Sequence, residues 1–254
     1  VSGRDFLTAF VAAYETRGRI GSAVMDALCR RGGPQFSTTC GPYGVAVGVA
    51  RLLGLDAEGI HDALGIAGTY SGGLMQYDHG GGSVKRVYSG VAASGGMQAA
   101  RLAHAGMTGP EGILEGVRGL LRIYANDYRP ELLTAGLGTK WMLDTVYFKP
   151  YCCVGIIAGA IDGLTKLIAD HALAAEAVER VDVGFPSGFH DHAAITDHAK
   201  GSPGAPLSSA DVDAKFRSQV EPVLGAARCT SVLAALRDVA AVDDMAALVA
   251  QLVE

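Results

Sequence analysis

Aromatic and charged side chains are scarce in this sequence of 254 residues: aromatic residues make up 7%, with one tryptophan, and charged residues 19%. No basic block is present, and 21 Lys and Arg against 26 Asp and Glu give a formal net charge of −5. Because nucleic-acid-binding domains carry clustered positive charge, we expect no nucleic-acid partner. No stretch reaches the roughly 20 apolar residues of a membrane span, and no signal-peptide pattern is seen, so we expect no membrane partner.

Cysteine is also sparse, and its spacing is irregular. The five cysteines lack the spacing of a disulfide framework, and an odd number fits reduced thiols in a cytoplasmic protein. We interpret the adjacent pair Cys152 and Cys153 as two small buried residues.

Glycine, in contrast, is abundant. The chain has 35 glycines, roughly twice the usual share, and 49% of its residues are hydrophobic, which is enough for a sizeable core. Many glycines lie beside alanine and serine in apolar segments, which is typical of closely packed helices. In the segment 83–105, small residues recur at three- and four-residue spacing and predict close approach of a neighbouring backbone: Gly90, Ala93, Gly96 and Ala100.

The hydrophobic periodicity predicts a mainly α fold. Helices are expected over 5–31 (with a break near Gly18 or Gly21), over 43–53, after an N-cap at Asp56, over 83–105 and from Pro110 onward. Between them and the last helices, the pattern predicts a mixed region with a helix over 154–169 and strands over 146–148 and 178–185. The expected C-terminal helices are 209–224, 231–240 and 243–252.

Two glycine-rich segments fail the requirements of nucleotide-binding motifs. The segment 41–44 contains a proline and follows no predicted strand, and in the segment 80–85 Val84 separates the serine from the lysine. We therefore expect no organic cofactor.

Histidines 190, 192 and 198, with Asp191 and Asp197, form the densest group of potential metal ligands. The segment has the composition of a loop, and no matching ligand set is found elsewhere. We interpret it as a solvated polar turn and expect no metal site.

Two lysines occupy positions suited to binding an anion. Lys85 follows a triple-glycine loop at the start of the predicted helix 83–105, where free N–H groups and the helix dipole favour negative charge. Lys149 precedes Pro150 at the junction between the helical and mixed regions, where clefts form. From spacing alone, each is equally an ordinary surface lysine.

Several segments spread over most of the chain share the pattern of one protein family. The most specific is VKRVYSGVAA at 84–93. The others are LLGLD at 52–56, ALGIAG at 63–68, AARLA at 99–103, GMTGP at 106–110, ILEG at 113–116, KPY at 149–151 and AID at 160–162. Together they resemble the MmgE/PrpD family, which includes 2-methylcitrate dehydratase, cis-aconitate decarboxylase and iminodisuccinate epimerase.

The resemblance implies a large all-helical domain and a smaller α/β lid, assembled as a homodimer. It implies residues 1–145 as the first part of the helical domain, 146–202 as a reduced lid and 203–254 as the C-terminal return to the helical domain. Family members act on small di- and tricarboxylates without metal or organic cofactor, by moving a proton or releasing carbon dioxide beside a carboxylate. By resemblance, Lys85 and Lys149 are the two active-site lysines, one from the helical domain and one from the hinge to the lid.

The sequence also departs from the family pattern. Gln35 stands where the family has a histidine, Tyr88 stands where a histidine is common, and Ala158 aligns with a further histidine. Family members are much longer, so we expect much of the lid and an N-terminal segment with an Asp, a Thr and a His to be missing. Neither Gln35 nor Ala158 can act as a general base.

Two hypotheses follow from these observations. The first is a lyase or isomerase with an altered acid–base set, in which Lys85, Lys149 and Tyr88 are catalytic and Gln35, Tyr70 and Tyr151 bind the small carboxylate substrate. The second is a degenerate homologue that serves as a dimeric scaffold, a binding subunit or a repurposed enzyme. The retained lysines favour the first hypothesis, whereas the missing histidines and lid favour the second.

Overall fold

The computed structural model describes residues 1–31, 34–125, 127–153, 155–183 and 206–253. The chain is mainly helical, as the sequence predicts. Its internal contacts divide it into two units, Val1–Leu143 with Asp238–Glu254, and Asp144–Arg237. The three-segment division implied by the family resemblance stays a prediction. No helix in the described part of the chain is long and apolar enough to cross a membrane.

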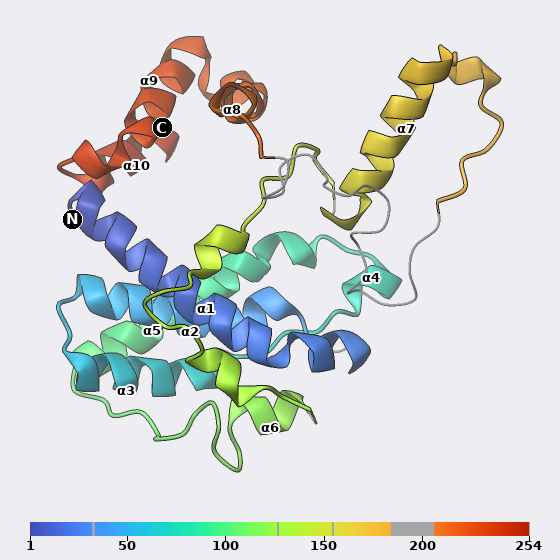
Figure 1. Cartoon of the computed structure of the whole chain (residues 1–254). Helices are drawn as coiled ribbons and strands as arrows, with labels where there is room; N and C mark the ends of the chain where they lie inside the picture. Colours follow the sequence, from blue (N-terminus) through green and yellow to red (C-terminus); the bar gives the residue numbers. More distant parts are fainter. Residues whose placement is uncertain (32–33, 126, 154, 184–205, 254) are drawn as a thin grey trace. The chain divides into compact units, whose positions relative to one another are not determined.

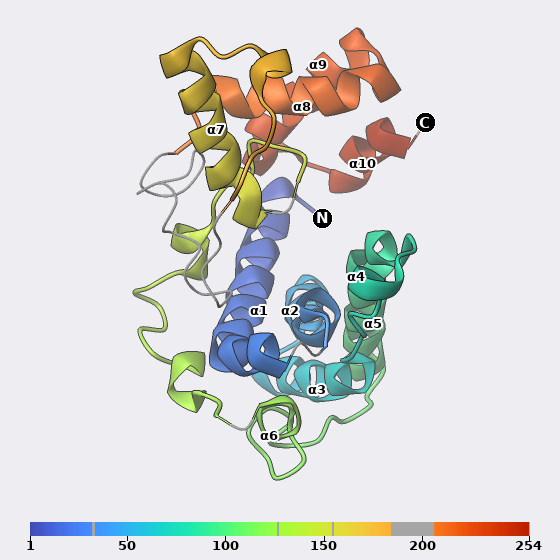
Figure 2. The same cartoon turned by 90° about the vertical axis from the view of Figure 1, so that its right-hand side faces the viewer.

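The first unit is built on four helices: α1 (Gly3–Arg31), α2 (Phe36–Leu52), α3 (Ala57–Ala67) and α5 (Tyr88–His104). Helix α2 lies between α1 and α5, and α3 packs against α2 and α5 (Figures 1 and 2). Glycines permit this close packing, since a Cβ at Gly44 would lie 2.4 Å from the Ala13 carbonyl oxygen, and one at Gly96 would lie 2.5 Å from that of Pro42. The core between the helices is small-residue and aliphatic, with Tyr43 as its largest fully buried side chain.

Helix α1 is continuous, so the break expected near Gly18 or Gly21 was wrong. Both glycines serve packing instead. A Cβ at Gly18 would lie 2.9 Å from Cγ of Met142, and one at Gly21 would lie 2.3 Å from the ring of Phe36. These glycines allow other segments to lie against α1 without interrupting it.

Helix α2 begins seven residues before the expected start and contains Pro42. A proline inside a helix deprives the carbonyl four residues earlier of its N–H donor. Here that carbonyl belongs to Thr38, and it accepts a hydrogen bond from the Gly72 N–H at 3.2 Å. A contact from a distant segment therefore satisfies the group that Pro42 leaves without its helical partner.

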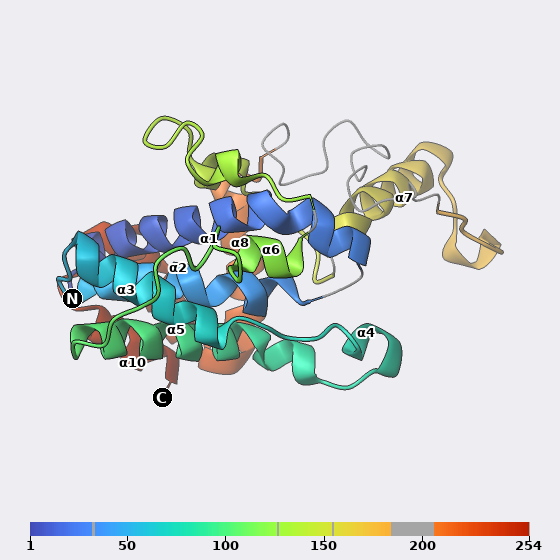
Figure 3. The same cartoon turned by 90° about the horizontal axis from the view of Figure 1, so that it is seen from below.

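The remaining elements of the first unit are short: η1 (Gly68–Tyr70), α4 (Tyr77–Gly80), η2 (Val84–Val87), α6 (Leu120–Tyr124), η3 (Pro130–Leu133), η4 (Met142–Thr145, which runs on into the second unit), η7 (Val239–Ala241) and α10 (Met245–Val253). Figure 3 shows the segment with α4 beyond the N-terminal start of α5. The helix expected from Pro110 does not form. Gly112 has a left-handed φ of +65°, and a Cβ at Gly109 would lie 2.4 Å from the Asp62 carbonyl oxygen, so this segment turns over α3.

The second unit contains η5 (Gly155–Ile157), α7 (Ala158–His171), η6 (Ala175–Ala177), α8 (Ser209–Leu224) and α9 (Ala226–Arg237). The strands predicted over 146–148 and 178–185 were wrong for the described residues 146–148 and 178–183, which form no ladder. A strand needs a paired neighbour, and the one β-bridge in the described ranges joins Pro34 to Leu74 in the first unit. The described part of the expected lid is therefore helical, without the β component of an α/β lid. The histidine group at 190–198 lies outside the described residues.

Candidate active site

The candidate site in the first unit is built on a segment that is attached to the start of α2. The Gln35 N–H donates to the Gly73 carbonyl oxygen at 3.1 Å, and the Ser71 hydroxyl donates to the Thr39 carbonyl oxygen at 2.8 Å. Gly73 has a left-handed φ of +103°, and a Cβ there would lie 2.1 Å from Oγ1 of Thr38. Only glycine fits this position, and it fixes the path of the segment that leads to Lys85.

An aromatic pair and a lysine follow on this segment. The Tyr88 hydroxyl donates to the Leu74 carbonyl oxygen at 2.5 Å. The Tyr77 ring meets the Tyr88 ring edge-on at 5.4 Å between centroids, and Nζ of Lys85 lies 5.4 Å from the centroid of the Tyr77 ring. The face of an aromatic ring attracts a cation, so Tyr77 orients an ammonium group that remains exposed.

We expected Lys85 at the start of the helix 83–105, but it does not lie in the first turn of α5. It lies in η2, and α5 begins at Tyr88 without a side-chain N-cap. Short 3₁₀ turns are common at helix N-termini, and this one follows Gly81 and Gly82, whose φ angles are +75° and +98°. The ammonium group is therefore presented by a turn just before the helix.

Gln35 and Tyr70 are both engaged in local contacts. The Gln35 side-chain oxygen accepts from the Thr38 N–H at 2.9 Å and so caps α2. Tyr70 packs on α5, where a Cβ at Gly95 would lie 2.7 Å from its Cβ, and its hydroxyl donates to Oε1 of Gln98 at 3.3 Å. Gln35 and Tyr88 thus contact the adjacent residues Gly73 and Leu74, whereas Tyr70 lies farther along α5.

Lys149 and Tyr151 belong to the second unit. The side chain of Lys149 is exposed, and its carbonyl oxygen accepts a hydrogen bond from the Lys215 ammonium group. The Tyr151 hydroxyl donates to Oδ1 of Asp162 at 2.5 Å, and this hydrogen bond to a carboxylate raises the pKa of Tyr151. Lys215 also lines a cavity of about 250 Å³ next to Pro150 and Cys152.

The burial expected for the vicinal cysteines was wrong. Cys152 is exposed and Cys153 is half-buried, because both lie in a bend before α7 rather than on a packed helix face. Cys40 is the opposite case: burial in the core raises the pKa of its thiol to about 12.

Sequence reasoning did not identify Tyr77, the Leu74 carbonyl oxygen or Lys215. Tyr77 lies between glycines in a segment without periodicity, and a main-chain acceptor leaves no signal in a sequence. Lys215 lies on α8, 66 residues from the carbonyl oxygen that it contacts. Only the folded chain brings these groups to Tyr88 and Lys149.

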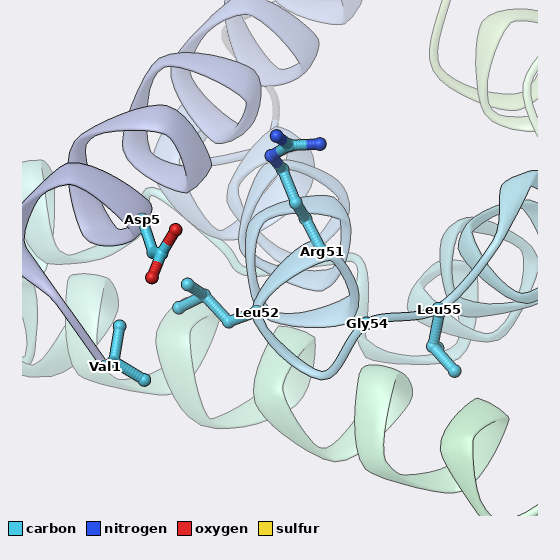
Figure 4. Close-up of a pocket in the computed structure, with 6 residues that line it drawn as sticks. All are labelled: Val1, Asp5, Arg51, Leu52, Gly54 and Leu55. Carbon is cyan, nitrogen blue, oxygen red and sulfur yellow. The ribbon is translucent and has the colours of Figure 1, made fainter.

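None of the predicted site residues lines the two cavities described in the first unit. One, of about 360 Å³, lies between the start of α1 and the end of α2 and is lined by Val1, Asp5, Arg51, Leu52, Gly54 and Leu55 (Figure 4). The other, of about 300 Å³, lies beside Glu15, Arg19 and Trp141 on α1 and the segment facing it. Across the described ranges, no group of three or more His, Cys, Asp or Glu side chains is placed to hold a metal ion.

Comparison with known proteins places the first unit in a family. Residues 1–133, which carry Gln35, Tyr70, Lys85 and Tyr88, match the model of the MmgE/PrpD N-terminal domain. The chain is 34% identical to cis-aconitate decarboxylase of Aspergillus terreus over 174 residues, which cover 66% of this chain and 35% of the relative. It is 38% identical to the cis-aconitate decarboxylase-like protein oryM of Aspergillus oryzae over 180 residues, 66% of this chain and 36% of the relative.

The human relative gives the same result. The chain is 31% identical to cis-aconitate decarboxylase of Homo sapiens over 180 residues, which cover 68% of this chain and 36% of the relative. The chain therefore spans about a third of the length of the curated relatives that it matches. With the family model matched over more than half of its residues, the chain belongs to the MmgE/PrpD family.

Proposed function

We propose that this chain is a lyase or isomerase of the MmgE/PrpD type that acts on a small di- or tricarboxylate by cofactor-independent proton transfer. The observation that carries the proposal is the placement of Lys85. Its ammonium group is exposed and oriented by Tyr77 on a segment that is attached to α2 and held by Tyr88. This segment lies within the part of the chain that matches the family model.

The chemistry needs cations beside the reacting carbon. Loss of carbon dioxide or of a proton next to a carboxylate leaves an electron pair that delocalises onto the carboxylate oxygens, and an ammonium group stabilises that charge. In the proposal Lys85 binds one substrate carboxylate and Lys149 binds another. Either ammonium group can also return a proton to the carbon.

In this proposal Tyr88 has a smaller role in proton transfer than the sequence analysis assigned to it. Its O–H already donates to the Leu74 carbonyl oxygen, so its phenol oxygen is an acceptor in this state. Proton donation by Tyr88 requires that this hydrogen bond break first. Gln35 retains its amide N–H groups for a substrate oxygen, because the hydrogen bonds to Thr38 use its carbonyl oxygen. Tyr70 and Tyr151 complete the proposed substrate contacts.

The proposal includes a homodimer in the cytoplasm. Apolar side chains at the start and along α5 are exposed to solvent: Val87 and Val91 at 54% and Met97 at 48%. Burying such side chains against a second copy is favourable, and sedimentation velocity decides between one copy and two. A sedimentation coefficient that fits only the monomer across the micromolar range would contradict the dimer.

Proton NMR in D₂O tests the chemistry. The whole chain is incubated with cis-aconitate, 2-methylcitrate, citrate and a substituted succinate, beside Lys85→Ala and a matched control, Lys166→Ala. Lys166 is also an exposed lysine, paired with Asp170 on α7, so its loss removes equal charge elsewhere. We expect conversion or exchange of a proton beside a carboxylate for the wild type and the control, and a rate lower on the order of 100-fold for Lys85→Ala. No exchange with any of the four acids would contradict the proposal.

One observation favours a second candidate, a binding subunit without family chemistry. The hydroxyls of Tyr88 and Tyr151 both donate to protein acceptors. The family resemblance also implies a histidine at the position of Gln35. This candidate predicts that calorimetry detects binding of a tricarboxylate that Lys85→Ala weakens, while NMR detects no exchange.

A further inference from the structure

A buried ion pair lies outside the candidate site. On α1, Nε of Arg19 donates to Oε1 of Glu15 at 2.6 Å, and the two residues are only 5% and 7% exposed. A charge removed from water is tolerated only when its remaining hydrogen-bonding atoms also find partners. The hydrogen-bond partners of the remaining atoms therefore show which part of the chain the ion pair binds.

Within the described residues, the other side-chain hydrogen bonds of the pair go to the main chain of one segment, residues 133–142, which we call the latch segment. The Arg19 guanidinium donates to the carbonyl oxygens of Leu133, Ala135 and Lys140 at 3.4, 3.0 and 2.9 Å. Oε2 of Glu15 accepts from the Met142 N–H at 2.7 Å. Four main-chain groups of one short segment are thus bound by two side chains.

The geometry requires these two residue types. A planar guanidinium group presents five donors in fixed directions and here bonds four acceptors, the Glu15 carboxylate and three carbonyl oxygens, whereas a lysine ammonium group has only three donors. The side chain of Met142 also lies against α1, where the missing Cβ of Gly18 leaves room for it. Trp141, the one tryptophan in the sequence, belongs to the latch segment and lines the cavity of about 300 Å³ beside Glu15 and Arg19.

The latch segment ends next to the boundary between the two units. Its last residue, Met142, lies two residues before Asp144, where the second unit begins, and seven residues before Lys149. Seven residues span at most about 25 Å, so fixing Met142 limits where Lys149 can lie.

We propose that Glu15 and Arg19 are positioning residues. They fix the chain where it leaves the first unit and thereby set where the Lys149 ammonium group is presented. The role in catalysis rests on the proposed function, whereas the fixing of the 142–149 segment does not. Neither side chain contacts substrate in this proposal.

The test compares wild type, Arg19→Lys and Glu15→Gln with Asp170→Asn, which disrupts the exposed ion pair of α7 at the same i, i+4 spacing. Each folded variant is studied well below its melting temperature. Acrylamide quenching of Trp141 fluorescence and tryptic cleavage after Lys140 report on the latch segment. Hydrogen exchange of peptides covering 141–149, and amine labelling of Lys149 by trace acetic anhydride, report on the segment that follows it. Turnover of the acids named above supplies KM and kcat.

We expect Arg19→Lys to increase Trp141 quenching and to speed both Lys140 cleavage and 141–149 exchange by about 10-fold or more, because local opening becomes easier. The rate of Lys149 labelling changes together with the exchange rate of 141–149. KM rises and kcat falls. Asp170→Asn matches wild type in every readout. Glu15→Gln gives the same pattern in smaller measure, so the proposal is decided even if Arg19→Lys does not fold.

Two results overturn the proposal. In one, the latch opens but exchange over 141–149 and labelling of Lys149 equal those of wild type. In the other, the variants lose thermal stability with every local readout unchanged, which is a purely structural role. If wild type turns over none of the acids, the proposed function fails, and exchange and labelling alone decide whether the pair positions Lys149.

Discussion

Replacing Gly96 by alanine tests the packing that carries the candidate site. Gly96 lies on α5 against α2, and a Cβ there would lie 2.5 Å from both the Pro42 carbonyl oxygen and Cβ of Val45, and 2.9 Å from the Ala46 nitrogen. Favourable contacts between such atoms begin near about 3.5 Å, so α5 must move away by about 1 Å. Two of the three atoms are main chain and cannot rotate aside. We therefore expect a cost near the upper end of the ~1–3 kcal/mol that overpacking typically causes.

A matched control lies on the same helix. A Cβ at Gly90 would meet no atom within 4 Å, so Gly90→Ala should gain the ~0.5–1 kcal/mol by which alanine exceeds glycine in a helix. The same gain offsets part of the cost at Gly96, which leaves Gly96→Ala destabilised by about 2 kcal/mol and the two variants about 3 kcal/mol apart.

Urea denaturation followed by circular dichroism measures both free energies of unfolding, with equal m-values as the check that one transition is compared. Because Tyr88 is the first residue of α5, displacement of the helix also disturbs the Tyr88–Leu74 hydrogen bond. If Gly96→Ala proves as stable as Gly90→Ala, the packing argument is refuted.

The sequence correctly predicted features that depend on neighbouring residues, such as helix caps and helix bounds. Asp56 caps α3 as its position before an apolar run indicates, and α8 covers the predicted 209–224. The small residues of α5 were correctly assigned to close packing at Gly96 but not at Gly90, which is exposed. The spacing of small residues predicts a helix that can pack closely, but it does not predict which of those residues the neighbouring helix reaches.

The incorrect expectations share a different cause. Pro42 was expected to lie outside a helix, but Gly72, 30 residues later, supplies the missing donor. The alternating segment 178–183 has strand-like composition but no strand beside it in the described ranges. In the candidate site, Lys85 came from the family resemblance, whereas its contact with Tyr77 depends on the fold of residues 71–88. Local composition therefore did not decide any of these three outcomes, which depend on the contacts that a segment makes or lacks once the chain has folded.

Two further predictions concern helices α2 and α3, which pack against α5 in the first unit. Asp56→Ala removes the oxygen that accepts from the Gly59 N–H at 2.9 Å and should cost about 1 kcal/mol in thermal or urea unfolding, and an unchanged midpoint would contradict the capping role. The second prediction concerns alkaline pH. Burial raises the pKa of the Cys40 thiol from 9.0 to about 12, with Arg17 opposing the shift, and burial likewise raises the pKa of Tyr43 from 10.0 to about 12. Both groups stay neutral in the folded chain while the unfolded chain ionises from about pH 9, so their contribution is complete below pH 9 and is lost as the pH rises toward 12. Each group then contributes a decline of about 1.4 kcal/mol per pH unit within its own range, which urea titrations at pH 8, 9, 10 and 11 measure. Cys40→Ala removes the thiol, so its slope between pH 9 and 10 should be close to flat, and a slope equal to that of wild type would show that Cys40 ionises as freely in the folded chain as in the unfolded one.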